Sequence, residues 1–139
     1  MVSDEKRALR QQCRRARQEL GHDDRQRETV AIAETVAIYL ARAQWPRLAS
    51  YVALADECDC NAIHEAYWQR GDSVLLPRVC EAGLLSWHPV LRPTQLMAGY
   101  RGIQEPDSKQ CPAVELDANV TVLVPGVAFD REGRRLGQG

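Results

Sequence analysis

Short apolar segments bounded by glycine and proline alternate with helical segments along this chain, and this alternation constrains the fold more than any other feature of the sequence. Residues 48–54, 73–79, 84–90 and 120–124 are rich in aliphatic residues and flanked by turn residues, which indicates strands. A short helix is expected at residues 61–70, between the first two strands. Strand, helix and strand in this order are typical of an α/β layered domain, so we predict a largely parallel sheet.

Two longer helices are predicted ahead of the first strand. The first covers residues 3–20, with Ser3 as its N-cap and acidic residues in its first turn, where the helix dipole favours negative charge. The second covers residues 23–42 and carries one apolar stripe at helical spacing, made of Ile32, Val36, Tyr39, Leu40 and Ala43. A chain of 139 residues suits a single domain, so we assign residues 1–139 to one domain.

Composition and charge argue against several classes of protein. The net charge is -1, so no overall positive field attracts nucleic acid. We expect neither a membrane span nor a secretory signal, because the sequence has no run of eighteen apolar residues and no apolar segment near Met1. The five cysteines are odd in number and form no Cys-x-x-Cys pair, so we expect reduced thiols in a cytoplasmic protein. Cys58 and Cys60 lack the second ligand pair that a zinc site needs.

The N-terminal part of the chain, from Lys6 to Arg27, is strongly basic. Lys6 and Arg10 are four residues apart and therefore share one helix face. Such charge clusters are usually solvated surfaces, and the alternative is that one or two of the cations contact an anion. The cluster consists of Lys6, Arg7, Arg10, Arg14, Arg15, Arg17, Arg25 and Arg27.

Further polar candidates come directly after predicted strands. Glu57 follows the first strand, and Arg78 closes the second. Ligands of parallel sheets bind outside the carboxyl ends of the strands, so both residues are candidate ligand contacts. Two alternatives stay open, because Glu57 is also placed to cap the helix near Asn61, and Arg78 to pair with a structural carboxylate. Residues 94–118 are expected to be mostly irregular, which is typical of a functional loop.

A glycine-rich tail follows the last predicted strand. Gly137 and Gly139 leave room for backbone amides to approach an anion, and Arg135 adds positive charge. The tail lacks the Gly-Lys-Ser/Thr ending of a P-loop, so composition alone favours a flexible terminus over an anion site.

Several segments together resemble one protein family. The tail contains Pro-Gly-Val-Ala-Phe-Asp at residues 125–130, then Gly133, then Arg-Leu-Gly-Gln-Gly at residues 135–139, and this pattern is similar to the signature of the 5-formyltetrahydrofolate cyclo-ligases. Other parts of the chain resemble the family's N-terminal helix, its first strand with an acidic loop, and two further segments. These parts are residues 6–10 with Arg14 and Arg17, residues 51–57 with Asp59, residues 76–79 and residues 102–106.

The resemblance implies a fold and a reaction. The fold is a three-layer α/β/α domain with a largely parallel sheet, of the NagB, RpiA and CoA-transferase type. The reaction is the ATP-dependent cyclisation of 5-formyltetrahydrofolate to 5,10-methenyltetrahydrofolate, with release of ADP and phosphate. The formyl oxygen is phosphorylated, a neighbouring nitrogen attacks, and phosphate leaves. The implied partners are ATP, Mg²⁺ and the small-molecule folate, with no nucleic acid and no membrane.

The resemblance also implies roles for particular residues. Arg135 would be the catalytic cation, because phosphoryl transfer needs positive charge around spreading negative charge. The folate would be bound by Glu57, which accepts from its ring N–H groups, by Trp87 as an aromatic wall, and by Arg78 and Glu105. Trp87 is equally suited to the core. The residues implied to bind ATP are Lys6, Arg7, Ala8, Leu9, Arg10, Arg135, Leu136, Gly137, Gln138 and Gly139.

The family's glycine-rich loop continues beyond the position of Gly139. We therefore expect C-terminal elements of the family fold to be missing, among them the metal-binding aspartate and the part of the sheet beside residues 120–124. A chain that ends there is expected to have little or no cyclo-ligase activity. Two hypotheses stay open: an enzyme or enzyme fragment with the family reaction, and a non-catalytic relative that binds folate or a protein partner without turning ATP over.

Overall fold

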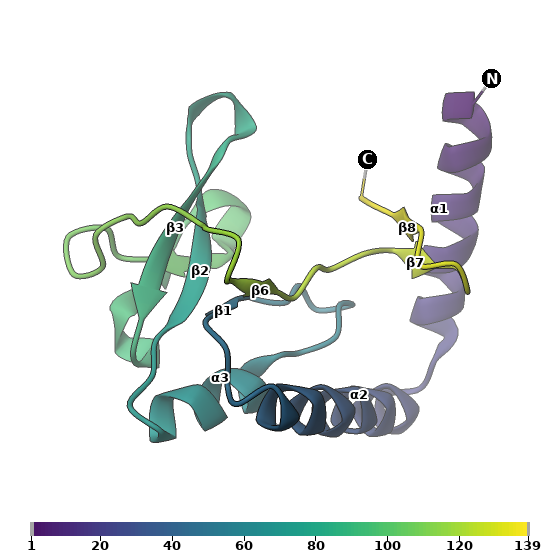
Figure 1. The fold of residues 1–139 in the computed structure, drawn as a ribbon. Coiled ribbons are helices and arrows are strands. Elements are labelled where there is room, and N and C mark those ends of the chain that lie inside the picture. Colours follow the sequence, from purple (N-terminus) through teal and green to yellow (C-terminus); the bar gives the residue numbers. More distant parts are fainter. Residues whose placement is uncertain (1, 139) are drawn as a thin grey trace.

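Two long helices open the chain in this computed structural model, which describes residues 2–138 (Figure 1). They are α1, Val2–Glu19, and α2, His22–Arg42. Both were predicted, but α1 begins at Val2, so Ser3 lies in its first turn and is not the N-cap. Helix ends lack the full hydrogen-bond ladder, and their sequence signals are therefore uncertain by a residue or two. Figure 1 shows α1 standing away from the sheet at one side of the molecule.

The central sheet has the strand order β3-β2-β1-β6. Its strands are β1, Leu48–Ala49; β2, Val74–Val79; β3, Leu85–Val90; and β6, Thr121–Val122. β1 runs parallel to both neighbours, with Leu48 opposite Val74 on one side and opposite Thr121 on the other. β3 pairs antiparallel with β2. The predicted α/β fold with a largely parallel sheet is therefore confirmed.

The core lies between this sheet and the helices α2 and α3. Helix α3 covers Asn61–Gln69, which agrees with the prediction for residues 61–70. Leu40 from α2 and Tyr67 from α3 are buried against Leu48 and Leu76 of the sheet. Tyr67 also donates from its hydroxyl to the Pro46 carbonyl at 2.7 Å. The polar tip of this large side chain is thus satisfied inside the core.

Two of the predicted strands are much shorter than expected. The segment 48–54 forms only Leu48–Ala49, and the segment 120–124 forms only Thr121–Val122. After β1 the Ser50 amide still donates to the Leu75 carbonyl at 2.9 Å, but the Tyr51 hydroxyl then donates to the Cys58 carbonyl at 2.9 Å. These contacts turn the chain out of the sheet into a loop, which the apolar pattern could not reveal.

The remaining elements are small. β4, Leu96–Ala98, and β5, Gln104–Pro106, form an antiparallel ribbon inside the segment expected to be irregular. β7, Ala128–Phe129, and β8, Arg135–Leu136, form a second ribbon in the glycine-rich tail. Short 3₁₀ turns occupy Glu81–Gly83, Pro93–Gln95 and Tyr100–Gly102. Within residues 2–138, every helix is too short or too polar to cross a bilayer.

A buried histidine links α3 to the chain that leaves β1. The His64 side chain is 1% exposed, and its Nε2 lies 2.7 Å from the Ser50 Oγ. Burial disfavours the charged imidazolium and lowers the pKa of His64 to about 4. The folded protein therefore holds this side chain neutral at pH values where an exposed histidine would already carry a proton.

The free energy of unfolding should fall as the pH drops from about 6.5 toward 4. The unfolded chain takes up the proton of His64 near pH 6.5, whereas the folded chain does so only near pH 4, so this contribution is complete above pH 6.5 and is lost below it. It amounts to at most roughly 3 kcal/mol. Urea unfolding at several pH values measures it.

His64→Gln is the informative variant, because the amide keeps a partner for Ser50 but does not titrate. Its stability should decline less steeply between pH 6.5 and 4 than that of the wild type. His22→Gln, at an exposed position, is the matched control and should follow the wild type. Equal slopes for His64→Gln and the wild type would contradict the assignment.

Candidate functional site

The basic helix α1 and the tail lie side by side, although 127 positions separate Arg10 from Gly137 (Figure 1). Arg10 Nε donates to the Gly137 carbonyl at 2.8 Å. Arg14 Nη2 donates to the Gln138 carbonyl at 2.9 Å and to its side-chain Oε1 at 2.6 Å. Such charge-assisted bonds are stronger than neutral ones. The fold therefore brings together the two segments predicted to bind ATP, and their role in binding stays a prediction.

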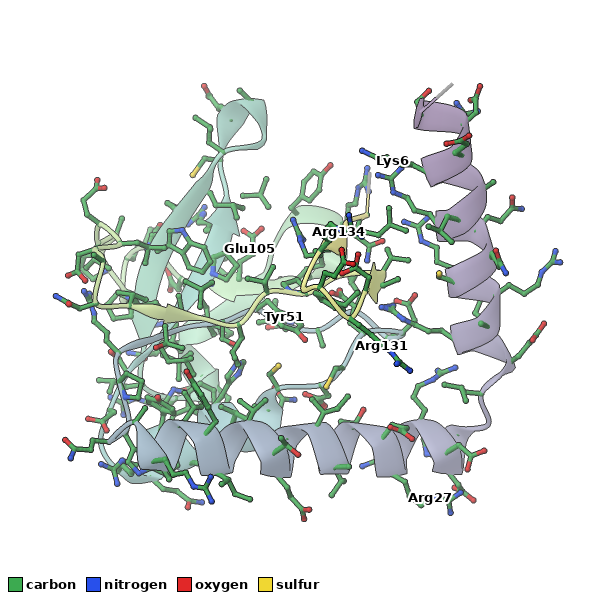
Figure 2. The ribbon with its side chains drawn as sticks, turned by 45° about the vertical axis from the view of Figure 1, so that its right-hand side comes forward. Lys6, Arg27, Tyr51, Glu105, Arg131 and Arg134 are labelled. Atoms are coloured by element: carbon green, nitrogen blue, oxygen red, sulfur yellow. The ribbon has the colours of Figure 1, made fainter. Side chains whose placement is uncertain are left out.

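A basic cavity of about 660 Å³ lies along this contact. Lys6 extends from α1 toward the tail in Figure 2, whereas Ala8 and Leu9 are exposed on the same helix. The residues that line the cavity are Arg7, Arg10, Gln11, Arg14, Arg15, Gln18 and Gln138. Guanidinium groups and amides, with no carboxylate in this lining, make the cavity suited to a group with several negative charges.

The tail is an ordered hairpin where it is described. The Asp130 carboxylate accepts the amides of Glu132 and Arg134 at 2.9 Å each, and lies 2.5 Å from Arg134 Nε. The Arg134 side chain and these amides hold the pKa of Asp130 below its usual value. A Cβ on Gly126 would lie 2.7 Å from the Phe129 Cζ and 2.9 Å from the Arg135 Cγ, so a larger residue here would have to displace these side chains. The described tail therefore does not match the flexible-terminus alternative.

The predicted catalytic residue braces the same hairpin. Arg135 Nη1 donates to the Pro125 carbonyl at 2.8 Å. The Leu136 carbonyl accepts the Val127 amide at 2.7 Å, next to the start of the hairpin. Gly139, also predicted to bind ATP, lies outside the described residues. Part of the Arg135 guanidinium is thus engaged with the backbone, and its catalytic role stays a prediction.

Glu57 lies in the loop that follows β1 and is half-buried. Its Oε1 accepts the Leu54 amide at 3.1 Å, and its own amide donates to the Leu54 carbonyl at 3.0 Å. Asp59, not Glu57, accepts the Asn61 amide at the start of α3, at 2.8 Å. The capping alternative for Glu57 is therefore wrong, and its carboxylate is instead held in a tight turn.

Glu57 and Arg17 line the same cavity of about 510 Å³, between α1, α2, the loop after β1 and the tail. Arg17 Nη2 donates to the Gly126 carbonyl at 2.6 Å, and Arg17 Nη1 donates to the Asp56 carbonyl at 3.1 Å. Most of the wall is apolar, made of Leu20, Ile32, Val36, Ile63, Val122, Leu123, Val124, Val127 and Phe129. Mostly apolar walls with a few fixed polar groups are typical of sites for organic ligands.

The other predicted folate residues lie on β2, β3 and β5. Glu105 is 7% exposed, accepts the Tyr100 amide at 3.2 Å and the Val79 amide at 3.4 Å, and lies 4.0 Å from Arg78 Nε. Glu105 is thus the structural carboxylate with which Arg78 can pair, as the alternative for Arg78 requires. Trp87 is half-buried, and it borders a separate cavity of about 450 Å³.

All these residues lie at one edge of the sheet. β1, β2 and β6 are parallel, so their carboxyl ends share an edge, and the antiparallel β3 begins there. Polar residues after the strands were expected to meet at one sheet edge only if the strands were parallel. These three strands are parallel. Glu57 and Trp87 nevertheless border different cavities. Figure 2 shows Glu105 on the opposite side of the tail from α1.

No metal centre is formed by the residues described. Residues 2–138 contain no group of three or more histidine, cysteine, aspartate or glutamate side chains placed to hold a metal ion. Burial raises the pKa of the Cys58 and Cys60 thiols, which disfavours the thiolate that binds metals. The absence of a metal at these two cysteines stays a prediction.

Sequence reasoning gave no separate role to the Arg17 contacts. The sequence indicated Arg17 only as one member of the basic N-terminal cluster, and Asp56 only as part of residues 51–57. Arg10, Arg14 and Arg17 recur at a spacing of three to four residues, which places them on one helix face. That spacing is the one signal available, since the carbonyls they reach lie far away in the chain.

Comparison with known proteins gives one consistent result. The model of the 5-formyltetrahydrofolate cyclo-ligase family matches residues 2–139. A 5-formyltetrahydrofolate cyclo-ligase of Mycolicibacterium smegmatis is 36% identical over 95 residues, which are 65% of this chain and 48% of the relative. The chain thus spans about half the length of that curated relative.

Solved structures show the same similarity. The NMR structure of a 5,10-methenyltetrahydrofolate synthetase from Aquifex aeolicus has a TM-score of 0.80 and 28% identity, over 96% of this chain and 67% of that one. A 5,10-methenyltetrahydrofolate synthetase from Mycoplasma pneumoniae has a TM-score of 0.65 and 17% identity, over 96% of this chain and 71% of that one. The second match concerns the fold alone.

Gly99→Ala should destabilise the protein by displacing the Glu105 carboxylate. A Cβ on Gly99 would lie 2.3 Å from the Glu105 Cδ, so the carboxylate must leave its amide donors. We expect a loss of about 1–3 kcal/mol in the free energy of unfolding, measured with urea. Gly21→Ala is the control, because a Cβ there meets nothing within 4 Å. Equal stability of the two variants would contradict the close packing.

Proposed function

The chain belongs to the 5-formyltetrahydrofolate cyclo-ligase family, and on this basis we propose that it carries the ATP-dependent cyclisation of 5-formyltetrahydrofolate to 5,10-methenyltetrahydrofolate, with release of ADP and phosphate. It would thus be a carbon–nitrogen ligase of folate one-carbon metabolism. The observation that supports this most is the contact between the arginines of α1 and the tail, beside a cavity lined by guanidinium groups.

The basic cavity is the proposed site of the ATP phosphates. Arg10 binds the Gly137 carbonyl through Nε, which leaves its two terminal nitrogens to reach an oxyanion. Arg7 lies on the same cavity wall, where its Nη2 is 2.9 Å from the Asp4 carboxylate at the surface. Arg135 is the proposed cation at the transferred phosphoryl group. Several fixed cations suit phosphoryl transfer because the negative charge spreads over equatorial oxygens in the transition state.

Glu57 is the proposed anchor of the folate ring. The Leu54 amide fixes one carboxylate oxygen, so the other can accept from ring N–H groups in a defined direction. The apolar wall of the adjacent cavity would cover the flat ring system. Trp87, Arg78 and Glu105 remain proposed folate contacts, from the other end of the same sheet edge.

Mg²⁺ would accompany the nucleotide. The residues described offer it no cage of their own, and Mg²⁺ in nucleotide sites is held largely by phosphate oxygens and water. The five cysteines are free, as expected for the cytoplasmic location that we propose.

The alternative proposal is binding without turnover of ATP. It is favoured by the contact of the proposed catalytic cation with the backbone, since Arg135 Nη1 donates to the Pro125 carbonyl at 2.8 Å. In that case folate or a protein partner would occupy the site, and the basic cavity would bind nucleotide without a chemical step.

An absorbance assay for 5,10-methenyltetrahydrofolate tests the proposal. The purified chain is given 5-formyltetrahydrofolate, Mg²⁺ and ATP, with an ATP-free control, and nucleotide binding is measured separately by calorimetry. Product that depends on ATP would support the proposed reaction and would contradict the expectation of little or no activity. Nucleotide binding without product would support the alternative, and a folded chain that shows neither would overturn both.

Arg10→Met should weaken MgATP binding by about tenfold or more, because a charge-assisted contact and the support of the Gly137 carbonyl are both lost. Calorimetric titration with MgATP measures the change. Arg27→Met removes one positive charge from the outer side of α2, away from the tail in Figure 2, and should bind like the wild type. Similar weakening in both variants would indicate a general charge effect and no contact at Arg10.

A further inference from the structure

We propose that Arg17 is a positioning residue that holds the tail and the Glu57 loop at a fixed separation, so that the nucleotide side and the folate side form one site. Its consequence for catalysis rests on the proposed function. Its structural part does not, because it concerns only how two distant segments of this chain are tied together.

One guanidinium joins the two segments. Arg17 Nη2 donates to the Gly126 carbonyl at 2.6 Å, while Nη1 donates to the Asp56 carbonyl at 3.1 Å and lies 3.6 Å from the Asp56 carboxylate. The Arg17 side chain is only 23% exposed, so these bonds are partly shielded from water. A planar, permanently charged group with several donors is suited to bridging two fixed acceptors.

The other arginines of the helix face make a different set of contacts. Arg10 and Arg14 reach Gly137 and Gln138, which are in the tail alone. Arg17 therefore differs from them in connecting the tail to the loop after β1. A matched substitution of Arg14 therefore leaves the contact between Arg17 and this loop intact.

Both acceptors of Arg17 adjoin elements of the proposed site. Gly126 begins the tail hairpin, where it packs closely against the Phe129 and Arg135 side chains. Asp56 directly precedes Glu57, the proposed folate anchor. A shift of either carbonyl would therefore move the nucleotide side or the folate side by a similar amount.

A second contact fixes the helix end that carries Arg17. The Arg17 carbonyl accepts from Arg25 Nη2 at 3.0 Å, which ties the last turn of α1 to α2. The guanidinium thus extends from an anchored stretch of backbone. Reactions between two bound groups need near-attack geometry, and a misplacement of about 1 Å can cost roughly a hundredfold in rate. Loss of Arg17 would release the two segments from each other.

Amide hydrogen exchange of the full chain tests this linkage without any activity. The Glu57 amide donates to the Leu54 carbonyl, and the Val127 amide donates to the Leu136 carbonyl, so each reports on one of the two segments. Arg17→Met should accelerate exchange at both amides by about tenfold, as expected for the loss of charge-assisted bonds. Arg14→Met, the matched control on the same helix, should accelerate exchange in the tail alone.

The second measurement is the effect of bound MgATP on amide exchange in the Glu57 loop. In the wild type, MgATP bound near the tail should slow exchange at the Glu57 amide, and in Arg17→Met this protection should be lost. Arg17→Lys covers the case in which Arg17→Met does not fold. The lysine ammonium lacks the planar fork of donors that reaches both carbonyls from Arg17, so Arg17→Lys should also accelerate exchange in at least one segment.

In turnover, Arg17→Met should raise the KM for both ATP and 5-formyltetrahydrofolate, whereas Arg14→Met should raise the KM for ATP alone. Unchanged exchange in either segment of Arg17→Met, or a uniform rise that includes the amides of β2, would overturn the proposal. For Arg17→Lys, unchanged exchange in both segments would do the same. A wild-type chain that neither binds nor turns over ATP would refute the proposed function, while the exchange of both segments would still decide the role of Arg17.

Discussion

The parallel pairing of β1 with both β2 and β6 is the constraint on which the rest of the structure depends. Because the three strands run in one direction, the segments that follow them leave the sheet at the same edge. The loop containing Glu57 and the tail beginning at Gly126 thereby become neighbours. Without that pairing, Arg17 would have no pair of carbonyls to connect, and α1 would lack most of its contacts with the sheet side of the molecule.

The helices and the two longer strands could be predicted because their signals are local. α2 and α3 follow apolar periodicity, and β2 and β3 are mostly apolar segments between turn residues. The short β1 and β6 could not be predicted in length. Their ends are set by contacts such as that between the Tyr51 hydroxyl and the Cys58 carbonyl, which depend on the folded loop and not on residue type.

The part of the candidate site made by α1 and the tail was more predictable than the part made by the predicted folate residues. The family signature identified α1 and the tail, and the structure places them together through Arg10 and Arg14. The glycine content of the tail did not predict its hairpin, because the turn is closed by the Asp130 carboxylate. Glu57 and Trp87 border different cavities, and no spacing in the sequence encodes this separation.

The arginines of α1 bind the tail mainly through backbone carbonyls, and a carbonyl is the same chemical group at every residue. The helix therefore recognises the path of the tail and very little of its side chains. Residues at positions 137 and 138 could drift during evolution while the docking persisted, whereas a larger residue at Gly126 would have to displace the Phe129 and Arg135 side chains. Selection on this contact should consequently fall unevenly, more strictly on the arginines and the turn glycine, and loosely on the residues whose carbonyls they hold.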